Sequence, residues 1–132
     1  MRFPHPDSKG YDNTAFVGVD FGFEIQIDDA AAPDGAAIHK TSAIYGLAGP
    51  ANPGSLPVKP LGEWNRLEIR VTAQAYTVLL NGAQVTSFAF TAGSDAAHPD
   101  RGLPSTAAVP RFVGVQTHTG RVAFRRIQIK AT

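Results

Sequence analysis

The stretch AYTVLLNGAQVTSF, residues 75–88, constrains the fold more than any other part of the sequence. Two apolar-rich runs flank Asn81-Gly82, and an Asn-Gly pair supplies both positive-φ positions of a tight type I′ turn. The stretch therefore predicts a β-hairpin. Thirteen glycines and ten prolines separate other short runs rich in Val, Ile, Phe and Thr, which is typical of an all-β domain with substantial loops.

Eight strands are predicted, and no long helix. Their ranges are 14–19, 22–28, 42–47, 64–72, 75–81, 84–90, 111–118 and 121–130. In the fourth strand, Leu67, Ile69 and Val71 are expected to face inward, while the charged residues between them face solvent. In the last strand the apolar positions change parity, which predicts a bulge or bend near Arg125-Arg126.

The length and charge of the chain limit its organisation and its partners. At 132 residues, of which 43% are hydrophobic, residues 1–132 are expected to form one domain with a real core. Twelve Lys and Arg against eleven Asp and Glu give a net charge of +1, which argues against nucleic-acid and membrane-surface partners. No export signal and no membrane-spanning apolar run are recognised, so the compartment is left open.

Several chemistries lack their sequence patterns. The chain has no cysteine, which excludes thiolate catalysis and Cys-based zinc sites. It has no Gly-x-Ser-x-Gly elbow, no phosphate-binding loop and no dinucleotide fingerprint. The four histidines do not have a metal-ligand spacing such as His-x-x-x-His, so neither a metal nor a cofactor is predicted.

The segment GFEIQIDD carries the first candidate site. With a period of two, Glu24, Gln26 and Asp28 lie on the face opposite to the apolar residues. Alternate residues of a strand are about 6.7 Å apart, so these side chains either line one groove that binds a sugar or simply meet water. Asp28-Asp29 could also begin a turn.

The segment VGVQTHTG repeats this pattern. Gln116 and His118 share a face with Gly114, whose missing side chain would leave room above the sheet. A lone histidine is more often structural than catalytic. Gln116 is treated as a candidate substrate-binding residue and His118 as a candidate catalytic residue.

Three further residues are weighed in the same way. Tyr45 could stack on a sugar ring or lie in the core, whereas Trp64 is expected in the core. Lys59 could place a cation at the groove, although a surface lysine beside a proline is common. Tyr45 and Lys59 are kept as candidate substrate-binding residues.

Five segments in order resemble the 3-keto-disaccharide hydrolase family. They are GFEIQIDD, AIYGLAGPA, KPLGEWNRLEIRV, VLLNGAQV and VGVQTHTGRVAFRRIQIK, and the resemblance covers roughly residues 2–130. The family is similar to concanavalin-like and laminin-G-like proteins. The resemblance therefore implies an antiparallel β-sandwich, a jelly roll whose concave face holds carbohydrate, in bacterial periplasmic or secreted proteins.

Members of this family usually have several more strands before the RFP segment at residues 2–4. We therefore expect the domain to lack the first strands of the family fold. A sandwich without these strands would have an exposed sheet edge, and such an edge invites pairing with another chain. The expectation is a homodimer or larger assembly formed through this edge.

The resemblance also implies a reaction, the cleavage of a glycoside oxidised to a ketone at sugar carbon 3. The ketone acidifies the C2 hydrogen, so Glu24 or His118 would remove that proton and the other would protonate the leaving oxygen. Gln26 or Gln116 would donate a hydrogen bond to the enolate, and water would then add. The alternatives are a carbohydrate-binding module without activity and a structural domain without sugar affinity.

Overall fold

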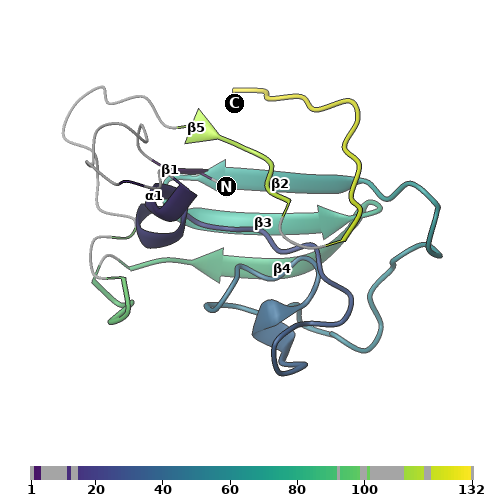
Figure 1. The fold of residues 1–132 in the computed structure, drawn as a ribbon, viewed down its shortest axis with the longest axis horizontal. Coiled ribbons are helices and arrows are strands. Elements are labelled where there is room, and N and C mark those ends of the chain that lie inside the picture. The colour runs from purple at the N-terminus through teal and green to yellow at the C-terminus, as the bar shows by residue number, and fades with distance from the viewer. Residues whose placement is uncertain are drawn as a thin grey trace.

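The structure, a computed structural model, describes residues 2–3, 12, 15–91, 93–98, 101, 112–117 and 120–131. Its elements are β1 (Arg2–Phe3), α1 (Ala15–Phe21), η2 (Ala37–His39), β2 (Leu67–Thr72), β3 (Ala75–Leu80), β4 (Ala83–Ala89) and β5 (Phe112–Val113) (Figure 1). All strand pairs are antiparallel and the helices are short, which agrees with the predicted all-β class. None of the helices described here has the length and apolar character needed to cross a bilayer.

The predicted hairpin is confirmed and forms the centre of a three-stranded sheet in the order β2-β3-β4. Asn81 and Gly82 have φ values of 51° and 90°, which a type I′ turn requires at both central positions. On the other side of β3, Thr72 pairs with Ala75, so β2 and β3 form a second tight hairpin.

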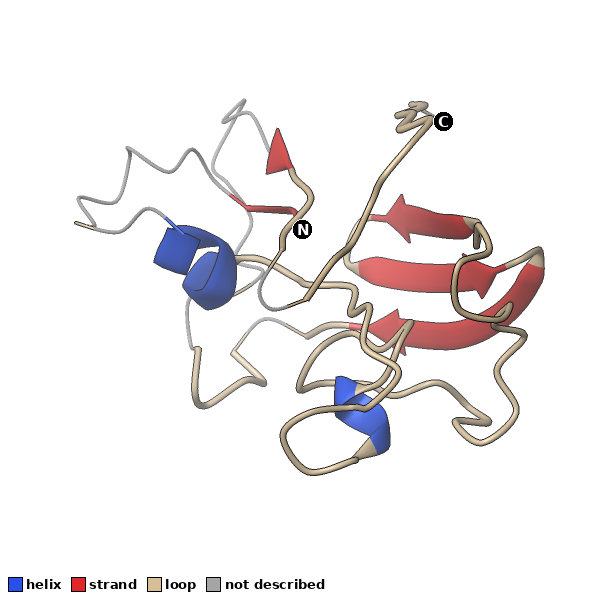
Figure 2. Cartoon of the chain, turned by 45° about the vertical axis from the view of Figure 1, so that its right-hand side comes forward, coloured by secondary structure: helices blue, strands red, loops and turns tan. Residues whose placement is uncertain are grey.

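One face of this sheet is the core. Tyr76, Val78 and Leu80 are 3%, 0% and 2% exposed, because the segment that follows α1 crosses in front of the sheet (Figures 1 and 2). The ring of Phe23 lies 4.8 Å from that of Tyr76, and 4.9 Å from that of Phe90. Aromatic rings at these separations add to the stabilisation from burial.

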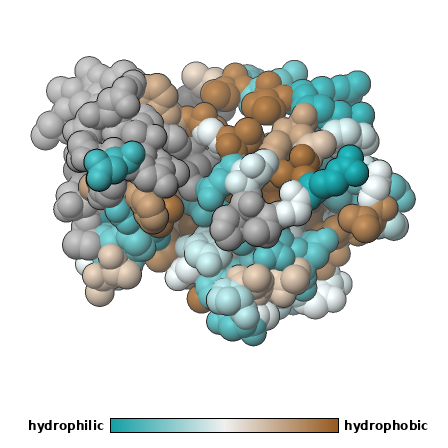
Figure 3. Space-filling view, in the orientation of Figure 1, coloured by the Kyte–Doolittle hydropathy of each residue, from teal (hydrophilic) through white to brown (hydrophobic). Residues whose placement is uncertain are grey.

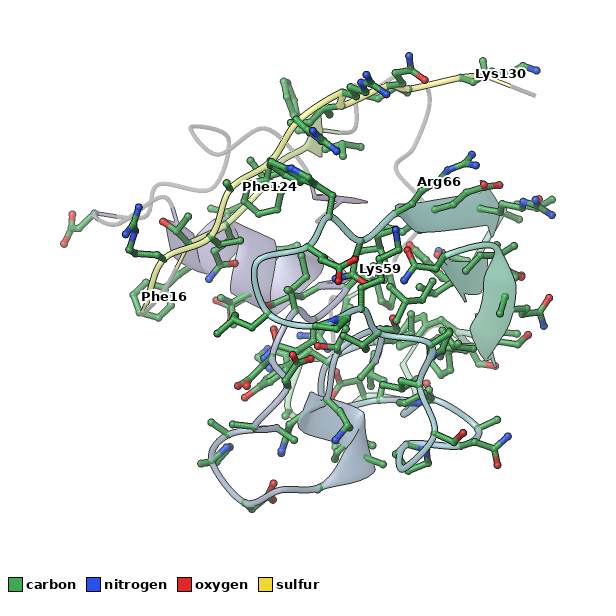
Figure 4. The ribbon with its side chains drawn as sticks, turned by 90° about the vertical axis from the view of Figure 1, so that its right-hand side faces the viewer. Phe16, Lys59, Arg66, Phe124 and Lys130 are labelled. Atoms are coloured by element: carbon green, nitrogen blue, oxygen red, sulfur yellow. The ribbon has the colours of Figure 1, made fainter. Side chains whose placement is uncertain are left out.

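The predicted strand at 14–19 is wrong, since Ala15–Phe21 forms helix α1. Gly22 N–H donates to Gly18 C=O at 3.1 Å, which is the hydrogen bond of an α-turn. Val17 is fully buried while Phe16 is 53% exposed and points away from the molecule (Figure 4). A short apolar run fits a strand or a buried helix equally well, and here the helix forms.

Other predicted strands are shorter than expected. Ranges 22–28 and 42–47 contain isolated bridges, Ile25 with Ile44 and Ile44 with Ala48, and no continuous ladder. Among residues 112–117, the described part of range 111–118, only the two residues of β5 form a strand. Within the described residues, the sheet that would complete a sandwich is therefore not continuous.

The C-terminal segment, residues 121–131, forms no strand, although it was predicted to be one. The predicted bulge or bend near Arg125-Arg126 is not observed, although Arg126 has a positive φ of 53°. Ile127 and Ile129 are 63% and 77% exposed, and hydrophobic groups gather along the upper edge of the molecule, where this segment runs (Figures 1 and 3). Trp64 was expected in the core, but this is wrong: it is 43% exposed and lies 3.9 Å from the guanidinium of Arg125.

Candidate functional site

The predicted alternation in GFEIQIDD holds over most of the segment. Phe23 is buried, while Glu24, Gln26 and Asp28 are half-buried on the opposite face. Ile27, expected on the apolar face, is 53% exposed, so the core ends before it. The polar side chains therefore share a face that is partly exposed to solvent.

A second segment, 41–45, runs antiparallel beside this one and adds Tyr45 to its polar face. Ile25 and Ile44 are bridge partners, and Tyr45 N–H donates to Glu24 C=O at 3.0 Å. Since neighbouring strand residues alternate between faces, Glu24 and Tyr45 lie on the face opposite to these isoleucines. Tyr45 is 37% exposed, which leaves part of its ring available for stacking.

Tyr45 extends this face toward an Asp-His pair. The rings of Tyr45 and His39 have centroids 4.8 Å apart, and His39 Nδ1 lies 2.7 Å from Asp34 Oδ1. A hydrogen bond from Ala36 N–H, followed by the bond from His39, lowers the pKa of Asp34. An ionised carboxylate only accepts hydrogen bonds, so His39 Nδ1 is the donor in this contact.

A buried arginine from a distant part of the chain contacts helix α1. Arg101 is 8% exposed, its Nη1 lies 2.9 Å from Asp95 Oδ2, and its Nη2 donates to Val19 C=O at 2.7 Å. Its Nε has no hydrogen-bond partner within the described part of the chain. Two contacts thus fix the guanidinium against α1 and leave one N–H unused.

The charges around Arg101 only partly offset the effect of its burial. Burial lowers the pKa of Arg101, and the carboxylates of Asp95, Asp20 and Glu24 oppose this shift, in decreasing order. Asp20 also lies 3.3 Å from His98 Nδ1 through its Oδ1. Glu24 is thus one of three acids whose charges act on this buried cation, and its contribution is the smallest of the three.

The sequence analysis did not find Arg101, Asp95 and His98. All three lie in the long connection between β4 and β5, and long connections in compact domains are often functional. Loop length and the acid-base-rich string DAAHPDR were the available signals. Neither signal could show that the arginine folds back onto α1.

Asp28 has a structural role that the sequence left open as an alternative. Its Oδ1 accepts hydrogen bonds from Ala30 and Ala31 N–H at 2.8 and 3.1 Å, and its Oδ2 accepts one from Ala32 N–H at 3.1 Å. These bonds form the turn that follows the segment. Substrate binding by Asp28 stays a prediction, and most of its acceptor capacity is already used.

The remaining predicted residues lie on other segments or outside the described residues. Gln116 is exposed on the segment after β5, and His118 lies outside the described residues. The backbone N–H of Lys59 donates to Asn65 Oδ1 at 2.9 Å, and Asn65 is in turn bonded to Asn81. This places Lys59 beside the β3–β4 turn, at the end of the sheet away from α1 (Figures 1 and 4).

The described side chains form no group of three or more His, Asp or Glu residues that could hold a metal ion.

Comparison with known proteins gives one match. A family profile described as a 3-keto-alpha-glucoside-1,2-lyase-like domain matches residues 8–130. No match was found among curated proteins or among solved structures. The match covers most of the chain, and its description suggests a carbohydrate-related enzyme.

Proposed function

Because the chain belongs to the family of 3-keto-alpha-glucoside-1,2-lyase-like domains, we propose that it cleaves 3-keto-glycosides, including 3-keto-disaccharides. The proposed reaction eliminates the group at C1 after loss of the C2 proton, and water then adds. The description "1,2-lyase" fits an elimination between these two carbons. We further propose that residues 1–132 act as one domain of a concanavalin-like jelly-roll sandwich.

The observation that carries this proposal is the position of Glu24. The residue is half-buried, on the face that also carries Tyr45 and Gln26. A general base must be ionised before it accepts a proton, and carboxylates are ordinarily ionised at neutral pH. Glu24 is therefore our candidate for the base that takes the C2 proton.

Atoms and electrons balance in the proposed steps without a cofactor. Glu24 takes the C2 proton, and the electron pair of the C–H bond forms an enolate with the C3 ketone. The enolate then collapses, a C1–C2 double bond forms, and the C1–O bond breaks as the leaving oxygen is protonated. Addition of water across the double bond gives the free 3-keto sugar. The net reaction is hydrolysis.

Other side chains have supporting roles in this proposal. Gln26 or Gln116 donates a hydrogen bond to the enolate oxygen, a kind of contact that contributes most when charge develops in the transition state. His118 protonates the leaving oxygen. Tyr45 stacks on the sugar ring, and Asp28 and Lys59 complete the list of predicted substrate-binding residues.

The test compares two isosteric changes at carboxylates. The purified protein is incubated with a 3-keto-disaccharide and the released sugar is measured. Loss of the base in Glu24→Gln should lower the rate by about 10²- to 10⁴-fold. Glu63→Gln makes the same change at an exposed glutamate in the loop before β2 and should leave the rate unchanged. Parental activity in Glu24→Gln would exclude this residue as the base.

A second function, carbohydrate binding without turnover, is favoured by the exposure of two aromatic residues. Tyr45 and Trp64 are 37% and 43% exposed, and exposed rings stack on sugars without acid-base chemistry. Binding of the 3-keto-disaccharide by calorimetry, without sugar release by the parent protein, would support this function over the enzyme. Absence of both binding and release would leave a structural role.

A further inference from the structure

Strand β2 has one free edge. Asn81 N–H donates to Arg66 C=O at 2.8 Å, so the backbone groups of Arg66 point toward β3. Alternate residues of a strand direct their backbone groups to the same side, and Leu67, Ile69 and Val71 therefore direct theirs away from β3. None of these three forms a backbone hydrogen bond on that side with any residue the structure describes.

The side chains of β2 also indicate an incomplete contact. Ile69 is 42% exposed although Val78, its direct partner on β3, is fully buried. On the opposite face, Glu68 Oε2 accepts a hydrogen bond from Arg66 at 3.0 Å, and Glu68 Oε1 accepts one from Arg70 at 2.8 Å. The edge thus combines unpaired backbone groups, a partly uncovered core residue and alternating charges.

We propose that β2 is the contact surface for a second copy of the chain, which adds its own β2 antiparallel across a two-fold axis. With the axis at Ile69, that residue lies opposite the partner's Ile69, and Leu67 lies opposite the partner's Val71. All the outward backbone groups of β2 then find partners, and the two three-stranded sheets become one.

Charge selects this register over its neighbours. With the axis at Ile69, Glu68 of each copy lies opposite the partner's Arg70. Moving the axis by one residue keeps the backbone pairing but sets Glu68 opposite the partner's Glu68, or Arg70 opposite the partner's Arg70. Like charges directly opposite are destabilising and unlike charges are stabilising. The sequence around Ile69 is therefore self-complementary.

The C-terminal segment runs on the side of this edge. It passes above β2 in Figures 1 and 4, where Arg66 and Lys130 mark the two elements. No backbone hydrogen bond joins residues 121–131 to any described residue. The partner sheet needs this segment to move aside, and that movement breaks no backbone hydrogen bond of the described structure.

Sedimentation velocity on the full chain tests the proposal. A strand-to-strand interface is small, so we expect dissociation constants on the order of 1 to 100 μM. Glu68→Arg and Arg70→Glu each set like charges opposite one another twice in the dimer, and each should weaken it by about tenfold or more. The double variant Glu68→Arg/Arg70→Glu restores unlike pairs and should return the parental constant within about threefold. Glu63→Arg and Arg121→Glu make the same charge changes outside β2 and serve as controls.

A cysteine tests the register. The chain has no native cysteine, and two residues that face each other in a hydrogen-bonded antiparallel pair have Cα atoms about 5.5 Å apart, within the range of a disulfide. Under mild oxidation Ile69→Cys should give a covalent dimer, whereas Ser87→Cys on β4 should not. A parent protein that is monomeric up to 100 μM, on the order of the weakest affinity expected, would overturn the proposal. So would a dimer indifferent to both charge reversals, or one linked equally well through either cysteine.

Discussion

Strand β3 and the C-terminal segment have similar alternating sequences and opposite surroundings. In β3, Tyr76, Val78 and Leu80 are almost completely buried, whereas Ile127 and Ile129 in the C-terminal segment are mostly exposed. β3 has a strand on each side, and the C-terminal segment has none among the described residues. Periodicity thus specifies which residues share a face, while neighbouring strands decide whether that face is buried.

Removal of a large apolar side chain from each region should give the largest difference. Leu80→Ala leaves a cavity in the core and should lower the free energy of unfolding by about 2 to 5 kcal/mol. Ile129→Ala should lower it by less than about 0.5 kcal/mol, because its side chain is mostly in water. Urea unfolding monitored by circular dichroism measures both. Equal losses would mean that the C-terminal segment is buried in solution.

Two glycines allow a similar comparison of backbone strain. Gly82 and Gly120 have φ values of 90° and 82°, and a Cβ at either position would meet no atom within 4 Å. Gly82→Ala should lower the free energy of unfolding by about 1 to 2 kcal/mol, because the turn between β3 and β4 fixes this conformation. Gly120→Ala should cost less than about 0.5 kcal/mol, since the segment after it can change conformation to relieve the strain. Thermal unfolding of both variants measures the difference.

The features that were predicted correctly from sequence depend on residues that are adjacent in the chain. The Asn81-Gly82 turn follows from the φ values that its two residues tolerate. Helix α1 was missed because seven residues are too few for periodicity to separate a helix from a strand. Trp64 was misplaced because its only observed ring contact, with Arg125, joins segments far apart in the chain.

The same distinction applies to the candidate site. Alternation of polar and apolar residues predicted that Glu24 and Gln26 share a face, and the residue type of Asp28 predicted the turn that follows it. The contact of Arg101 with α1 could not be predicted from a local pattern, because its hydrogen bond to Val19 joins residues 82 positions apart in the sequence. Contacts of this length depend on the whole chain path, which no local pattern contains.

The stacked pair of Trp64 and Arg125 is the contact that attaches the C-terminal segment to the loop before β2. Their separation of 3.9 Å predicts a coupling of about 0.5 to 1 kcal/mol, as expected for an exposed cation–π pair. A double-mutant cycle with Trp64→Leu and Arg125→Gln, evaluated from urea unfolding, measures this coupling. The cycle of Trp64→Leu with Arg121→Gln is the control and should give no coupling.

The smallest expected effect concerns the charges of the two regions. On β2, the hydrogen bond from Arg70 is the main cause of a lowered pKa of Glu68, and the charges of Arg70 and Arg66 lower it further. A carboxylate with a lowered pKa in the folded protein stabilises the fold above its ordinary value, here 4.5. That contribution is lost as the pH falls through the folded pKa.

Removing one arginine from β2 and one from the C-terminal segment distinguishes two influences on the pKa of Glu68, direct contact and net charge. Arg70→Gln should raise the pKa of Glu68 toward 4.5, because its main hydrogen-bond donor is lost while Arg66 remains. Arg126→Gln removes the same charge from the C-terminal segment and should leave this pKa nearly unchanged, since screening by salt weakens distant surface charges. Titration of the Glu68 carboxyl carbon by NMR measures both. Equal shifts would mean that the pKa responds to net charge and not to the contacts along β2.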